Sequence, residues 1–260
     1  MPVGEQRDTS AIDPALFYTG LVAELYEPLK SVTQDPEPYV RFIGASGEPA
    51  LELGCGDGHP LLVLRGRGID VEGVDSSPDM LDRCRAAADV LGLEVVLHHQ
   101  RMESLELGCR YRSIFLAGPT FNLLPDGDAV AGALDGIRRH LDDGGSALIP
   151  LFVPRPTPAD RLGGVREATE EDGSVIRVAA VAERRDEDER RQETVMRYER
   201  TIGGATTVLE RTWILHWHSQ DTFRALAAAA GLTTVAVLDA DGAPAGEGAD
   251  LFVFWLQRTV

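Results

Sequence analysis

A glycine-rich run, Glu52-Leu53-Gly54-Cys55-Gly56-Asp57-Gly58, carries the residues of this sequence that are best suited to binding a ligand. The apolar residues before it predict a strand, and the glycines let the chain turn sharply and let a ligand lie against the backbone. Asp75 follows about 20 residues later, where a carboxylate can accept both hydroxyls of a ribose. Glu52 suits a ligand with a positively charged end.

Dinucleotide binding is the first alternative for this run. The fingerprint GxGxxG requires a glycine three positions beyond Gly56, and that residue is His59. The run reads instead as E-x-G-x-G-x-G, in which an acidic residue suits a positive group better than a phosphate. An NAD-binding oxidoreductase requires His59 to be tolerated in place of glycine.

The elements around this run alternate between strands and helices. Such alternation predicts crossover connections and a doubly wound, mostly parallel α/β sheet of seven strands. Ser77-Pro78 and Ser219 are typical helix starts, and Gly92 and Gly231 are typical stops. The predicted strands are 49–53, 69–74, 93–98, 113–116, 146–153, 233–238 and 251–257, and the predicted helices are 60–67, 78–91, 128–141 and 220–230.

The alternation stops after Pro154. Three segments, 174–182, 193–201 and 206–218, are predicted strands, and the charged run 183–191 and the pair Gly203-Gly204 separate them. We expect an inserted antiparallel sheet that acts as a lid. The predicted domains are therefore 1–153 with 214–260, which bind the cofactor, and 154–213, which forms the lid or substrate subdomain.

The N-terminal segment reads as one amphipathic helix. Asp13-Pro14 is typical of a helix start, and Phe17, Leu21 and Leu25 recur every four residues. A polar segment with three prolines between residues 28 and 38 ends this pattern.

The sequence resembles the class I S-adenosylmethionine-dependent methyltransferases. The resemblance rests on the glycine-rich run and on the segment Val71–Leu81, which contains Val74-Asp75-Ser76-Ser77-Pro78. It continues through Gln100-Arg101-Met102 and Ile114–Ala117 and resumes at the predicted helix after Ser219. It implies a Rossmann-like fold and S-adenosylmethionine as the cofactor.

The resemblance also implies roles for matching residues. Glu52 and the backbone at Gly54 and Gly56 would hold the methionine portion, and Cys55 would pack beneath the cofactor. Asp75 would bind the ribose. The other implied contacts are Ser76 and Met80 beside the adenine, Arg101 and Met102 around the adenine ring, and Ala117 and Gly118 near the methionine and the acceptor. Many members have an acidic residue where Arg101 stands, so its side-chain contact departs from the family pattern.

A narrower resemblance concerns small-molecule N-methyltransferases of the glycine/sarcosine and amino-sugar kinds. They place an antiparallel lid at the same point of the chain, and an N-terminal helix with tyrosines closes over the cofactor. Tyr18 and Tyr26 match that placement. They are equally well explained as core aromatics of the first helix.

The sequence contains no unmistakable general base. Weak catalytic candidates are Tyr18 and the pair His216 and His218, which would share one face of a strand. No third metal ligand accompanies that pair, and we expect no metal site. Because a neutral amine needs no strong base for methyl transfer, an amine or an acidic hydroxyl is the expected acceptor. A sensor that binds S-adenosylmethionine or its demethylated product without turnover is the alternative.

Composition limits the partners. The 260 residues carry a formal charge of −17, which disfavours nucleic acids and anionic membranes. The three cysteines form no CxxC pair, and no stretch is apolar enough to span a membrane. We expect a cytoplasmic protein, monomeric or homodimeric, that acts on a small molecule. A single lysine among abundant Ala, Gly and Arg suggests a bacterial source.

Overall fold

The computed structural model describes residues 5–7, 13–29, 35–170 and 172–259. The chain divides into two compact units. Unit 1 comprises residues 1–32 and 154–215, and unit 2 comprises residues 33–153 and 216–260. Residues 1–32 thus belong to the same compact unit as the segment expected to form a lid. The division predicted from the sequence differs, because it places residues 1–32 with the cofactor-binding residues.

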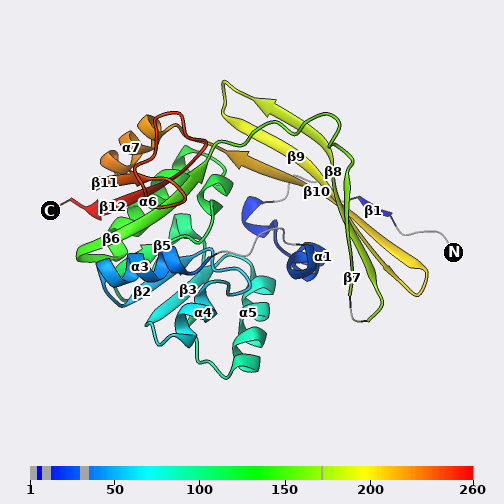
Figure 1. The fold of residues 1–260 in the computed structure, drawn as a ribbon, viewed down its shortest axis with the longest axis horizontal. Helices are drawn as coiled ribbons and strands as arrows, with labels where there is room; N and C mark the ends of the chain where they lie inside the picture. Colours follow the sequence, from blue (N-terminus) through cyan, green and yellow to red (C-terminus); the bar gives the residue numbers. More distant parts are fainter. Residues whose placement is uncertain (1–4, 8–12, 30–34, 171, 260) are drawn as a thin grey trace. The chain divides into compact units, whose positions relative to one another are not determined.

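Unit 2 is built on a seven-stranded sheet with the order β11-β12-β6-β5-β2-β3-β4 (Figure 1). Neighbouring strands from β6 to β4 are parallel, and β12 runs antiparallel to both of its neighbours. The predicted doubly wound sheet is confirmed. Its strands are β2 (Ala50–Leu53), β3 (Val71–Asp75), β4 (Leu97–His99), β5 (Tyr111–Phe115), β6 (Leu141–Phe152), β11 (Leu232–Leu238) and β12 (Leu251–Arg258).

Helices cover both faces of this sheet. On one face α3 (Glu37–Ser46), α4 (Leu61–Gly66) and α5 (Pro78–Leu91) bury residues such as Phe42, Leu64 and Leu81. On the other face α6 (Gly127–His140) and α7 (Gln220–Ala229) bury residues such as Leu134 and Phe223. The short 3₁₀ helices η2 (Met102–Ser104) and η3 (Thr120–Leu123) follow β4 and β5.

Two predicted helix starts are confirmed by their caps. The Ser77 hydroxyl accepts the Met80 N–H at 3.2 Å, and the Ser219 hydroxyl accepts the Thr222 N–H at 3.2 Å. Gly92 ends α5 in the left-handed conformation, as expected. Local side-chain chemistry therefore fixes where the helices beside the sheet begin and end.

Unit 1 contains the second sheet, in which β7 (Val165–Thr169), β8 (Val175–Asp186), β9 (Arg191–Ile202) and β10 (Ala205–His216) are antiparallel neighbours. The short strand β1 (Glu5–Arg7) pairs with β10 in parallel. The expected inserted antiparallel sheet is confirmed, although β1 and β7 have no counterpart among the predicted strands. The five residues of β7 include both charge signs and small side chains, so the hydrophobic alternation typical of a strand is too weak to predict one.

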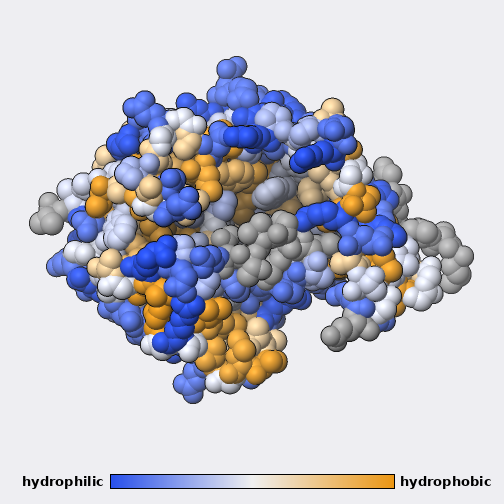
Figure 2. Space-filling view, viewed as in Figure 1, coloured by the Kyte–Doolittle hydropathy of each residue, from blue (hydrophilic) through white to orange (hydrophobic). Residues whose placement is uncertain are grey.

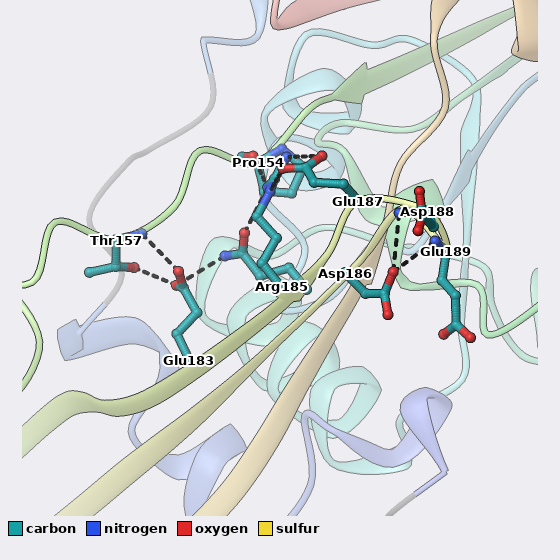
Figure 3. Close-up of polar contacts among 9 residues, drawn as sticks. Pro154, Thr157, Glu183, Arg185, Asp186, Glu187, Asp188 and Glu189 are labelled. Atoms are coloured by element: carbon teal, nitrogen blue, oxygen red, sulfur yellow. Dashed lines mark hydrogen bonds and ion pairs between the residues drawn. The ribbon is translucent and has the colours of Figure 1, made fainter.

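The charged run 183–191 comprises the end of β8, a mostly exposed turn at 187–190 and the first residue of β9. Glu183 accepts the Thr157 N–H at 2.8 Å and the Thr157 hydroxyl at 2.5 Å, and it accepts a hydrogen bond from Gln192 at 3.1 Å. Arg185 donates to the Pro154 carbonyl and pairs with Glu187 (Figure 3). These contacts attach the segment after β6 to the β8–β9 hairpin.

The N-terminal segment is not one helix, and this expectation is wrong. It forms η1 (Pro14–Leu16), α1 (Leu21–Glu24) and α2 (Tyr26–Leu29), and Gly20 breaks the helix with a φ of 55°. The Arg211 guanidinium on β10 accounts for the break, because it donates to the carbonyls of Leu16, Phe17 and Thr19. A continuous helix would use these carbonyls for its own hydrogen bonds.

The visible surface is mainly hydrophilic, with an apolar area in the region of α4 and α5 (Figure 2). Val90 and Leu91 at the end of α5 are 87% and 61% exposed. Among the described residues, no helix is long and apolar enough to cross a membrane.

Replacing Arg211 tests whether it organises the N-terminal segment. Arg211→Met removes the guanidinium hydrogen bonds to the buried Phe17 carbonyl and to the carbonyls of Leu16 and Thr19, so we expect the free energy of unfolding in urea to fall by about 2–3 kcal/mol. Arg177→Met, which removes an exposed ion pair with Glu167, is the matched control and should change it by less than about 1 kcal/mol. Equal losses in both variants would contradict this role.

Candidate functional site

The candidate site of unit 2 lies where the strand order reverses. β2 is central, its sequence neighbour β3 lies on one side, and β5 lies on the other. In an open parallel sheet, ligands bind outside the carboxyl ends of the strands at this switch point. The glycine-rich run after β2 and Asp75 at the end of β3 both occupy this edge.

The glycine-rich run follows a path that side chains would obstruct. Gly54 has a φ of 71°, and a Cβ there would lie 2.9 Å from Cγ2 of Thr120 in η3. Gly56 has a φ of 55°. The N–H groups of Gly54 and Cys55 donate to the Val74 carbonyl at 2.8 and 3.0 Å, which holds the run against β3.

Asp75 is held by backbone donors. Its Oδ2 accepts the Gly56 N–H and its Oδ1 accepts the Ser77 N–H, both at 2.8 Å. Burial raises the pKa of Asp75, and these N–H groups, that of Ser76 and the charge of His99 offset part of the rise. A carboxylate has about four acceptor positions, so these three N–H groups leave Asp75 some capacity to accept a ligand hydroxyl.

Glu52 is the most unusual group of the site. It is 1% exposed, and neither carboxylate oxygen has a hydrogen-bond partner of normal geometry among the described residues. Burial, followed by the charges of Asp75 and Asp57, raises the pKa of Glu52 well above its ordinary value, and the Leu61 N–H lowers it only in part. A buried carboxylate without partners is costly, which marks this position for a ligand that supplies a positive charge or hydrogen-bond donors.

Cys55 and Met80 pack beneath the run. Cys55 is buried, and its Sγ would lie 2.8 Å from a Cβ on Gly73. Burial, followed by the charges of Asp75 and Glu52, raises the pKa of the Cys55 thiol, so it stays neutral and serves as a small packing group. Met80 is buried, and its Cε would lie 3.5 Å from a Cβ on Gly56. Ser76 lies between β3 and α5, and its carbonyl contacts His99 Nε2 at 3.0 Å.

The remaining predicted residues of unit 2 follow β4 and β5. Arg101 precedes η2, and its guanidinium lies 3.7 Å from Glu103. Met102 packs against the core on the α6 face. Ala117 and Gly118 follow β5, and the Gly118 carbonyl accepts the Thr120 N–H at 2.7 Å. Arg101 and Met102 therefore follow the edge strand β4, and Ala117 and Gly118 follow β5, which is next to β2. Their ligand contacts remain predictions.

Tyr18 and Tyr26 belong to unit 1. Their rings meet edge to face with centroids 5.5 Å apart, and Tyr18 also contacts Phe17 at 5.0 Å. Tyr18 packs against the apolar cluster of this unit. Their roles toward the cofactor remain predictions.

His216 and His218 do not share a strand face, so that premise is wrong. β10 ends at His216, and His218 lies in the connection to α7, with its ring 6.1 Å from that of Phe223. The strand ends because Ser219 caps α7 three residues later. Within the described ranges, no three His, Cys, Asp or Glu side chains are placed to hold a metal ion.

Tyr39 was missed because the helix that carries it was missed. It lies in α3 and stacks on Phe115, with centroids 5.1 Å apart, and Phe115 pairs with Glu52 in the sheet register. Burial and then the charge of Glu52 raise the pKa of Tyr39, so its hydroxyl stays neutral. The recurrence of Tyr39, Phe42 and Ile43 after Pro36 and Pro38 is the signal that could have predicted this helix.

The two carboxylates, Glu52 and Asp75, fit S-adenosylmethionine better than a dinucleotide. Glu52 can pair with an amino-acid ammonium group, and Asp75 can accept ribose hydroxyls. A pyrophosphate beside Glu52 would instead meet like charge.

Comparisons with known proteins agree with this geometry. Residues 50–145 match a family described as methyltransferase domain. Among curated proteins, no sequence matches the chain. Among solved structures, the CcbJ methyltransferase from Streptomyces caelestis is 22% identical with a TM-score of 0.76, over 95% of this chain and 99% of that one.

Two further solved structures are similar. The sugar N-methyltransferase KedS8 from Streptoalloteichus sp ATCC 53650 is 19% identical with a TM-score of 0.70, over 92% of each chain. CalS10, an amino pentose methyltransferase from Micromonospora echinaspora solved with S-adenosylmethionine bound, is 22% identical with a TM-score of 0.65, over 93% of this chain and 98% of that one. Residues 50–145 therefore match a methyltransferase domain, and the chain has the fold of the S-adenosylmethionine-dependent methyltransferases, as the resemblance in its sequence predicted.

Proposed function

We propose that the protein transfers the methyl group of S-adenosylmethionine to a nitrogen or oxygen atom of a small molecule. The observation that carries this proposal is the buried carboxylate of Glu52 beside the glycine-rich run, which has no hydrogen-bond partner of normal geometry among the described residues. When bound, the cofactor supplies a methyl group on a positively charged sulfur with a neutral leaving group.

Glu52 and Asp75 bind the methionine portion and the ribose of the cofactor. The Glu52 carboxylate accepts the α-ammonium group of the methionine portion, and the charge that burial disfavours is then neutralised. The lone pairs of Asp75 that its backbone donors leave open accept the ribose hydroxyls. Tyr39 lies on the same side of β2 as Glu52 and presents an uncharged aromatic surface there.

The adenine is proposed to lie near Ser76, Met80, Arg101 and Met102. The Arg101 guanidinium lies near Glu103, so we assign the adenine contact of this segment to its backbone and to Met102. Ala117 and Gly118 leave room near the methionine, because neither has a bulky side chain. Tyr18 and Tyr26 are proposed to close over the bound cofactor, and residues 154–213 to form the substrate subdomain.

The residues have mainly to align the acceptor with the methyl group. An acceptor atom about 3 Å from the methyl group and in line with the breaking bond is sufficient for rapid transfer. A neutral amine requires no strong base, which agrees with a sequence in which no general base stands out. Solved structures of similar fold include a sugar N-methyltransferase and an amino pentose methyltransferase involved in calicheamicin biosynthesis. We therefore propose an amine acceptor in bacterial specialised metabolism and a cytoplasmic location.

Calorimetric titration tests the cofactor. The wild type should bind S-adenosylmethionine and S-adenosylhomocysteine but not NAD. Asp75→Ala should weaken binding at least about tenfold, because it removes hydrogen bonds to a charged group that are worth about 1.5–3 kcal/mol. Asp82→Ala, which removes a carboxylate of the exposed α5 surface, is the matched control and should bind normally.

Two results would contradict this proposal in different ways. Binding of NAD alone, or of none of the three, would exclude the cofactor. Binding of S-adenosylmethionine without formation of S-adenosylhomocysteine from any small amine or phenol would favour the sensor alternative.

Glu52→Gln should stabilise the ligand-free protein while weakening the binding of S-adenosylhomocysteine. Because the pKa of Glu52 is raised in the folded state, the wild type loses stability as pH rises above about 4.3, the ordinary value for Glu. The glutamine variant has no charge to bury. The difference between its free energy of unfolding and that of the wild type should therefore grow with pH to about 1–3 kcal/mol. Urea unfolding between acidic and neutral pH measures this, with the exposed Glu106→Gln as control. An advantage independent of pH, or a less stable variant, would refute the expected cost of this charge.

A further inference from the structure

Asn122, in η3, connects separate parts of unit 2 through one buried side chain. It is 1% exposed, and its Nδ2 donates to the carbonyls of Phe152 at 2.9 Å and His216 at 2.6 Å. Its Oδ1 accepts the Phe152 N–H at 3.3 Å. Two carbonyls on one side and an N–H on the other fix the orientation of the amide, and both of its N–H groups are used.

The backbone groups that Asn122 binds have a particular place in the chain. The chain leaves unit 2 after Val153 and returns to it at His216. Phe152 therefore lies immediately before the exit, and His216 is the first residue after the return. We call Phe152, Val153 and His216 the crossing residues. One side chain thus holds the two points through which the inserted sheet is attached.

The other end of η3 meets the glycine-rich run. Thr120 Cγ2 occupies the space beside Gly54, 2.9 Å from the position of a Cβ there. Phe121 anchors η3 in the core, where its ring meets that of Phe223 edge to face at 5.3 Å. A ligand that fixes the position of the run would therefore also restrict Thr120. Because η3 contains both Thr120 and Asn122, this restriction would reach Asn122.

We propose that Asn122 is a positioning residue that couples the glycine-rich run to the crossing residues through η3. This inference rests on the proposed function, because the ligand of the run is taken to be the cofactor. Cofactor binding orders the run and holds Thr120 in place, and Asn122 then fixes the exit and the return of the chain. His216 is positioned through its own backbone carbonyl, so its part in this coupling requires no chemical role for its ring.

Amide hydrogen exchange measured by NMR tests the coupling, with S-adenosylhomocysteine as the probe. In the wild type, saturating probe should slow exchange at the Phe152 amide at least about fivefold, a typical size for coupling between sites. Asn122→Asp places a carboxylate against two carbonyls, and Asn122→Ala removes the bonds. In both, the Phe152 amide should exchange faster without ligand, and the slowing by the probe should be lost while its affinity changes less than about threefold.

Two further variants make the test specific. Thr120→Ala removes the contact with Gly54 and leaves the hydrogen bonds of Asn122 in place, so it should reduce the slowing without faster exchange in the free protein. If neither Asn122 variant folds, Thr120→Ala alone tests the coupling between the glycine-rich run and the crossing residues. Ser113→Ala removes a buried hydrogen bond to the Gly47 carbonyl at 2.7 Å and is the control that should leave Phe152 unaffected.

A purely structural role for Asn122 would give a different result. Exchange would then quicken throughout unit 2, and the probe would slow Phe152 by the same factor in every variant, which overturns the proposal. Absence of slowing in a wild type that binds the probe also overturns it. If the wild type does not bind the probe, the proposed function and the coupling both fail, and exchange in the free variants still shows whether Asn122 holds the crossing residues.

Discussion

The buried carboxylate of Glu52 is the interaction on which the rest of the site depends. Its sheet neighbours are Gly73 and Phe115, and it is 1% exposed, with no hydrogen-bond partner of normal geometry in the part of the chain that the structure describes. Such a group lowers the stability of the folded chain. Functional sites commonly retain a destabilising charge when that charge is used for binding. The glycine-rich run and the backbone donors of Asp75 are arranged around this charge, so a ligand that carries an ammonium group and a ribose satisfies both acids.

Single polar side chains organise irregular segments within each unit. Asn122 holds the exit and the return of the chain in unit 2, and in unit 1 Arg211 holds three carbonyls of the N-terminal segment. Both are buried and bind backbone carbonyls, which makes their hydrogen bonds costly to lose. The structure thus uses a few buried donors to fix segments that have little regular structure of their own.

The sequence predicts the sheet, the run and Asp75 because these depend on local patterns. Strand periodicity, glycines at a turn, and caps such as Ser77 act within a few residues. The broken N-terminal segment depends instead on Arg211, which is 194 positions from Phe17, and no local pattern reveals that contact. The end of β10 before His218 depends on the competing cap at Ser219, and an alternation of two histidines could not show it.

The isolation of Glu52 was likewise beyond the sequence. Glycines after a strand suggest that Glu52 is functional, but only the packing of Tyr39 and Phe115 against that side of β2 shows how thoroughly it is shielded. The missed helix α3 is part of that shielding. Its apolar residues recur at helical spacing, but the prolines at its start favoured the interpretation of this segment as a loop.

The most direct test of this account is the titration of the Glu52 carboxyl group by carbon-13 NMR, with and without S-adenosylhomocysteine. In the free protein the pKa of Glu52 should lie well above its ordinary value, and in the complex it should fall sharply, because the ligand ammonium favours the ionised carboxylate. An ordinary pKa in the free protein, or a raised pKa that the ligand leaves unchanged, would contradict the claim that this buried charge is built for the cofactor.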